Sequence, residues 1–314
     1  MIKNALRVAP LPLFVLWFAG CSSSNGSTGS GGSGGNGGGG GGAQGTIFGD
    51  LNLKTFEADR YATLSGQFVD APKPHTMPLK IGMKQSGCEL LTPVTCDPAC
   101  PITSYCSNAG QCVVKPNPVS AGTLTVSGLA GITDPLDPTG PLYAYSGPTL
   151  QQPYPPCAEG SSFSIQSDKL TVSSKCIAPF VLTNTLPIPV KSGMATHLTW
   201  TPPAAGATSR VQISLEISHH GGYKGQIDCE VPDTGSFDMP EPLITALIAL
   251  GRAGYPSIDV QRIATGAAPN EPNAHLNAVS GVLVDVDTGV VSCMASTDCP
   301  TGMTCQVPGA HICQ

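Results

Sequence analysis

Histidine and acidic residues meet at one point of the sequence, where Glu216 precedes the adjacent pair His219 and His220, and Asp228 follows. Imidazole and carboxylate groups bind zinc, but a zinc site needs three or four of them around one ion. Neighbouring residues of a strand point to opposite faces, so both histidines can converge only in a turn. Two glycines follow the pair and favour a turn. The pattern predicts the polar end of a hairpin, and no metal ligand is predicted here.

Two Asp-Thr-Gly tripeptides stand at residues 233–235 and 287–289. The same tripeptide carries the aspartates of aspartic proteases, where two carboxylates share one site. In those enzymes a hydrophobic strand precedes the aspartate, and Ser or Thr follows the glycine. Pro232 before the first tripeptide favours a turn instead, and Val290 after the second does not fit. We therefore do not expect a protease.

Residues 285–289, Asp-Val-Asp-Thr-Gly, are similar to the start of a calcium loop. An EF-hand loop has glycine at position six and glutamate at position twelve. Here Gly289 is at position five and Ser296 is at position twelve, so a turn after a strand is the better interpretation. The sequence thus predicts no catalytic residue, no metal ligand and no cofactor.

Cysteine is the chemically reactive residue type that the sequence uses most distinctively, with 13 in the chain. The first, Cys21, stands apart from the others, and the remaining even number suits disulfide pairing in an exported protein. No C-x2-C pair is present, which argues against zinc sites. The disulfide candidates are Cys88, Cys96, Cys100, Cys106, Cys112, Cys157, Cys176, Cys229, Cys293, Cys299, Cys305 and Cys313.

Eight of these cysteines form two dense clusters, within residues 96–112 and 293–313, that share the pattern Cys-Pro, four residues, Cys. Segments this short cannot bury a core, so we expect each to be a small knob closed by its own disulfides. Four cysteines remain for two further bridges. We expect Cys157 to pair with Cys176 and Cys88 with Cys229, although spacing alone does not fix connectivity.

The N-terminus has the features of an export signal. Lys3 and Arg7 precede an apolar run over residues 8–20, which is too short to span a bilayer as a helix. Residues 18–21, Phe-Ala-Gly-Cys, resemble the lipobox of bacterial lipoproteins, with Phe18 where the family usually has leucine. The resemblance implies cleavage before Cys21, diacylglycerol on its sulfur and an acylated amino terminus, enough for stable membrane anchoring.

Composition divides the rest of the chain into a tether and a body. Residues 22–45 are nearly all Gly and Ser and predict a flexible linker. The body has many prolines, 30 in the whole chain, and charged residues are only 11%, which suits a loop-rich β protein. With a net charge of −6 and no basic patch, nucleic acid is not an expected partner.

Short runs with a two-residue period predict the strands of an antiparallel β-sandwich. One helix is expected, beginning near Pro242 and ending at Gly251. The expected strands lie at residues 123–126, 163–165, 170–172, 196–200, 211–217, 227–229, 282–286 and 290–291.

The expected organisation has five parts: a signal peptide (1–20), the lipidated cysteine and linker (21–45), an N-terminal β segment with a Cys-rich knob (46–116), a β-sandwich body (117–292) and a C-terminal knob (293–314). This arrangement resembles poorly characterised Cys-rich surface lipoproteins of the myxobacterial type. The likeness rests on the lipobox, the Gly/Ser tether, the two knobs and residues 198–202 and 229–237.

The resemblance implies a location in the cell envelope, anchored by lipid in the outer membrane and facing either the periplasm or the exterior, and it adds no catalytic residue. We expect a non-enzymatic surface lipoprotein that acts as a binding or structural module, with a glycan or protein as ligand. Two alternatives stay open: an extracellular hydrolase of polymer substrates, and an accessory subunit of an envelope assembly. The sequence does not indicate an oligomeric state.

Overall fold

The computed structural model describes residues 47–73, 78–147 and 153–314. The predicted signal peptide, Cys21 and the Gly/Ser linker lie outside the described residues. Among the residues that are described, no helix has the length and apolar character to cross a bilayer.

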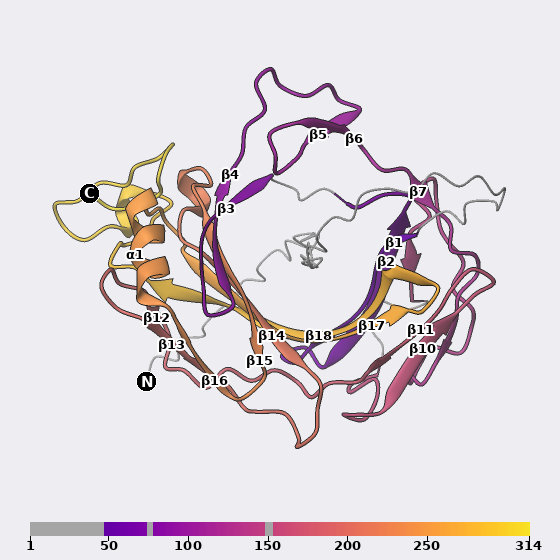
Figure 1. The fold of residues 1–314 in the computed structure, drawn as a ribbon. Helices are drawn as coiled ribbons and strands as arrows, with labels where there is room; N and C mark the ends of the chain where they lie inside the picture. Colours follow the sequence, from indigo (N-terminus) through magenta and orange to yellow (C-terminus); the bar gives the residue numbers. More distant parts are fainter. Residues whose placement is uncertain (1–46, 74–77, 148–152) are drawn as a thin grey trace, which may run out of the picture. The chain divides into compact units, whose positions relative to one another are not determined.

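A large mixed β-sheet organises the body (Figure 1). Its main strand order is β3-β4-β15-β14-β17-β18-β1-β2-β7, with β12 beside β18 and β9 beside β2. The strands are β1 (Phe48–Phe56), β2 (Tyr61–Val69), β3 (Leu79–Gln85), β4 (Cys88–Pro93), β7 (Pro118–Val119), β9 (Tyr145–Ser146), β12 (Ile188–Pro189), β14 (Arg210–Glu216), β15 (Gln226–Pro232), β17 (Ser257–Ala268) and β18 (Glu271–Asp287).

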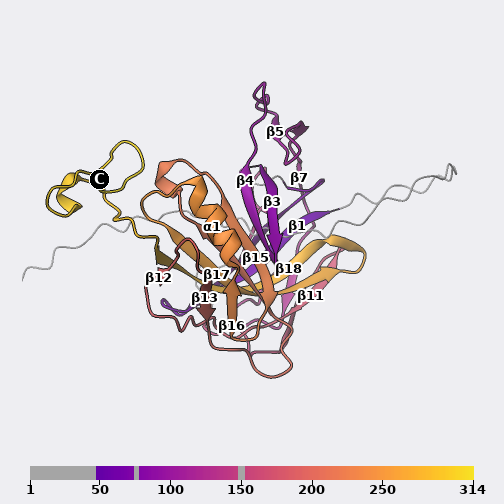
Figure 2. The ribbon, with the colours of Figure 1, turned by 60° about the vertical axis from the view of Figure 1, so that its left-hand side comes forward.

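Smaller elements cover one face of this sheet or form the knobs. Figure 2 shows the single α-helix of the described residues beside β15 and β4. The smaller elements are β5 (Ser104–Cys106), β6 (Cys112–Val114), β8 (Thr125–Ser127), β10 (Ser162–Gln166), β11 (Thr171–Lys175), β13 (Thr196–Thr199), β16 (Ser236–Met239), α1 (Glu241–Leu250) and the 3-10 turns η1 (His219–Gly221) and η2 (Ser296–Asp298).

The alternating sequence of the central strands decides which face is buried. In β14, Val211, Ile213 and Leu215 are buried, while the polar residues between them point to the other face. One apolar cluster packs β14, β15 and β17 against β13, β16 and α1. A second packs β1, β2 and β18 against β8, β10 and β11. The expected helix is confirmed, and Leu243, Ile244 and Leu247 bury its apolar face.

The expected fold class, a mainly β body with disulfide-linked knobs, is confirmed. The sheet is mixed, because β1 runs parallel to β18, with Asp50 opposite His275. Strands from residues 46–116 and from 117–292 join in this one sheet. The expected strand at 290–291 is wrong: the chain leaves β18 at Asp287 and enters the C-terminal knob without forming a second strand.

The twelve described cysteines form six disulfides. Cys88–Cys229 joins directly opposite residues of β4 and β15, and Cys157–Cys176 closes a short loop. Each knob closes on itself, as its cysteine spacing indicates. The knob bonds are Cys96–Cys106, Cys100–Cys112, Cys293–Cys305 and Cys299–Cys313.

Candidate functional site

The two Asp-Thr-Gly tripeptides have separate structural roles. Asp233 follows β15, where both carboxylate oxygens accept hydrogen bonds from Arg262. Asp287 ends β18, where its Oδ1 accepts the backbone N–H of Gly289 at 2.8 Å and its Oδ2 lies 3.9 Å from Lys191 Nζ. The carboxylates therefore do not share a proton as a protease pair would. Residues 285–287 are the end of β18, and the chain leaves the strand at residues 288–289.

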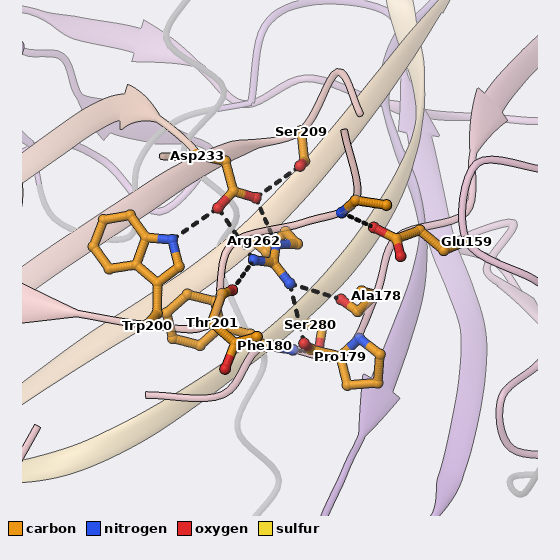
Figure 3. Close-up of polar contacts among 11 residues, drawn as sticks. Glu159, Ala178, Pro179, Phe180, Trp200, Thr201, Ser209, Asp233, Arg262 and Ser280 are labelled. Atoms are coloured by element: carbon orange, nitrogen blue, oxygen red, sulfur yellow. Dashed lines mark hydrogen bonds and ion pairs between the residues drawn. The ribbon is translucent and has the colours of Figure 1, made fainter. Parts of the chain in front are cut away.

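Arg262 is the centre of a buried polar network (Figure 3). It projects from β17 into the core, and its side chain is 1% exposed, against 2% for Asp233. Its remaining N–H groups donate to backbone oxygens of residues 178, 179 and 201. Burial alone would raise the pKa of Asp233, but hydrogen bonds from Arg262, Ser209 and Trp200 hold it below its usual range. All the N–H groups of the Arg262 guanidinium donate hydrogen bonds, and both carboxylate oxygens of Asp233 accept them. The network therefore holds the chain at residues 178–179 and 201 against β17, and it leaves neither group free for catalysis.

The opposite face of the large sheet is polar, and we call it the polar face. Figure 1 shows the sheet curving so that this face lies on the inside of the curve, with β10, β11, β13 and β16 outside. Its side chains are mostly half-buried amides, carboxylates and hydroxyls. They include Asp50, Asn52, Lys54, Glu89, Gln212, Ser214, Glu216, Gln226, Asp228, Asp259, Gln261, His275 and Asn277.

One row of this face carries carboxylates on three strands. Glu89 of β4 lies opposite Asp228 of β15. Ser214 of β14 lies between two aspartates, opposite Asp228 on one side and Asp259 of β17 on the other. Ser214 Oγ donates to Asp228 Oδ1 at 2.7 Å. Burial raises the pKa of Asp259, although a hydrogen bond from Gln261 and the charge of Lys54 oppose this. Asp228 and Asp259 thus flank a serine in different surroundings.

A second group gathers on β1 and β18. His275 Nδ1 lies 3.2 Å from Asp50 Oδ1, and Asn277 Nδ2 donates to Asn52 Oδ1 at 3.0 Å. The hydrogen bond with Asp50 raises the pKa of His275 by more than burial lowers it. Asn277 is only 2% exposed, and among the described residues its Oδ1 has no hydrogen-bond partner.

An aromatic pair lies on the same face of β1 and β2. The rings of Phe56 and Tyr61 stack with centroids 4.6 Å apart. Lys54 Nζ lies 5.7 Å from the centroid of Phe56. Asp50, Asn52, Lys54 and Phe56 are alternate residues of one strand, with the buried Leu51 and Leu53 between the first three, and they therefore form one line along β1.

The sequence signals found only part of this site. His219 and His220 lie in η1, a turn as expected, and the carboxylate of Glu216 reaches within 3.6 Å of His219 Nδ1. Asp228 instead bonds Ser214 on the polar face. The group of Asp50, His275 and Asn277 was not predicted, because Asp50 lies more than 200 residues before the other two and no motif links them.

Comparisons with known proteins do not assign the chain to a family: no family model matches it, and no curated protein matches it.

Proposed function

We propose that this protein is an exported, lipid-anchored binding protein of the cell envelope whose polar face binds a glycan. The lipobox resemblance at Cys21 supports the anchor. Glycan binding is supported by the line of side chains along β1. The carboxylate, amide and ammonium groups of this line are followed by the stacked aromatic pair at its end.

Sugars suit such a surface for physical reasons. Their hydroxyl groups both donate and accept hydrogen bonds, and so they pair with the carboxylate of Asp50 and the amide of Asn52. The C–H face of a sugar ring is apolar and packs on an aromatic ring such as Tyr61.

The charge pattern narrows the ligand class. The chain carries a net charge of −6, and carboxylates are frequent on the polar face, so an acidic polymer would be repelled. A neutral or amino-bearing glycan fits better. A protein ligand is less well supported, because the strongly exposed large apolar side chains on the described part of this face are few: Leu283 of β18, 65% exposed, and Ile81 of the edge strand β3, 49% exposed.

A second candidate function is glycan hydrolysis, and one observation favours it. Asp228 and Asp259 lie on strands separated by β14, and two strand spacings amount to about 9.5 Å. Inverting glycosidases hold their two carboxyl groups about 6.5–9.5 Å apart. The raised pKa of Asp259 suits a general acid. Release of reducing sugar ends by the wild type, and its loss in Asp228→Asn and Asp259→Asn, would support hydrolysis.

Binding is tested by passing the full chain in detergent over immobilised neutral, amino-bearing and acidic polysaccharides. We expect retention by a neutral or amino-bearing polymer, and weaker retention of Asn52→Ala and Tyr61→Ala. Lys191→Ala is the control, because this side chain is 54% exposed and the residue belongs to none of the strands that form the polar face. No retention on any polymer, or equal retention of all variants, contradicts the proposal. Recovery of one constant protein partner instead would favour an accessory subunit.

A further inference from the structure

Three histidines from distant parts of the sequence come together beside η1. The ring centroids of His219 and His220 are 5.0 Å apart. His311, from the C-terminal knob, places its ring centroid 4.9 Å from that of His220. Tyr255 covers another side of His220 with a centroid distance of 4.8 Å. The sequence shows only the adjacent pair, and the fold supplies the third imidazole.

Two of these rings have partners that orient them as metal ligands. His311 Nδ1 lies 3.2 Å from the backbone oxygen of Cys293, and His219 Nδ1 lies 3.6 Å from Glu216 Oε2. Histidine ligands of metals typically donate one ring N–H to a carbonyl or carboxylate, which leaves the other nitrogen for the ion. Glu216 is itself held, because its Oε1 accepts from the backbone N–H and Oγ of Ser218.

The side chains that face His220 are the imidazoles of His219 and His311 and the phenol ring of Tyr255. A metal ion binds imidazole in its neutral form.

We propose that His219, His220 and His311 form a binding site for a divalent transition-metal ion such as Zn²⁺, which joins the C-terminal knob to the body. Two imidazoles that share a tetrahedral Zn²⁺ through N–Zn bonds of about 2.0–2.1 Å have ring centroids roughly 5 Å apart. The two observed centroid distances match this spacing.

Ion binding at this site would draw the ring nitrogens of the three imidazoles closer together than they lie in the structure. In the described part of the chain, the groups of three ligand atoms already within 4.8 Å of one another consist of cysteines, and these are held in disulfides. The backbone of the knob is already docked, because Gly254 N donates to Ala310 O at 2.7 Å. His219 and His220 are exposed, so an ion can reach them from solvent.

The test uses tag-free full chain in detergent, stripped with a chelator and titrated with Zn²⁺ by calorimetry and with Co²⁺ by visible absorption. We expect one equivalent bound per chain, a tetrahedral Co²⁺ spectrum, and affinity at least tenfold weaker in His220→Ala and His311→Ala. His197→Ala is the matched control, since His197 is an exposed histidine paired with Asp238. Zn²⁺ should also raise the melting temperature of the wild type and not of His311→Ala. No binding by the wild type, or undiminished binding by either histidine variant, overturns the proposal.

Discussion

Arg262 and Asp233 form an ion pair between two side chains that are almost completely buried, with Nε to Oδ2 at 2.5 Å. Removing one partner of such a pair leaves a buried charge without compensation. Arg262→Met should therefore lower the free energy of unfolding by about 3–5 kcal/mol, measured by urea denaturation. Arg210→Met is the control, because Arg210 and Glu230 are 53% and 37% exposed and such pairs contribute about 0–1 kcal/mol. If both variants lost the same free energy of unfolding, the hydrogen-bond network around Arg262 and Asp233 would not be what stabilises the core.

The same pair predicts how stability depends on pH. The pKa of Asp233 is lowered in the folded protein, so its contribution is present above its unfolded pKa of about 3.9 and is lost as the pH falls through the folded pKa. We expect the urea midpoint to drop below about pH 4, and this drop to be smaller in Asp233→Asn. If the urea midpoint of Asp233→Asn fell with pH as steeply as that of the wild type, Asp233 would not be the source of the acid sensitivity.

Gly266 marks a close crossing of two sheets. A Cβ there would lie 1.8 Å from the carbonyl oxygen of Ser173 in β11, where Ser174 Oγ also donates to Ala264 O. Gly266→Ala should therefore cost about 3 kcal/mol or more, because backbone would have to move. Gly82→Ala is the matched change, since its nearest atom would be 3.5 Å away; we expect an effect within about 0.5 kcal/mol. Thermal unfolding compares the two, and similar melting temperatures would argue against the crossing.

Membrane attachment is predicted to depend on one atom, the sulfur of Cys21. Cys21→Ala should move the protein from the membrane fraction to the soluble exported fraction, because the acyl chains on this residue are the proposed anchor. Cell fractionation and the mass of the N-terminal peptide measure this. Continued membrane retention of the variant, or an unmodified cysteine in the wild type, would contradict the anchor.

The local elements were predictable because their signals are local. The two-residue period of Val211, Ile213 and Leu215 indicates a strand, and Pro242 with Gly251 bounds the helix. The cysteine spacing likewise indicates knobs that close on themselves. These features depend on neighbours within a few residues, and the structure contains each of them.

The long-range arrangement was not predictable in the same way. Nothing in a single sequence states that Asp50 lies opposite His275, because strand pairing is decided by the packing of the whole sheet. Asn277 has no motif around it. His311 gives no sign of meeting His220 until the knob docks. The missed strand β17 holds the buried Arg262, a charged residue where the pattern calls for an apolar one.

The proposal that the polar face binds a glycan is tested most directly by hydroxyl-radical footprinting of the full chain, with and without a retained polysaccharide. We predict that Phe56 and Tyr61 become protected, while Tyr255 and Met294, exposed at 37% and 60%, react as before. Protection confined to Tyr255 or Met294, with Phe56 and Tyr61 unchanged, would place the ligand elsewhere and contradict the proposal.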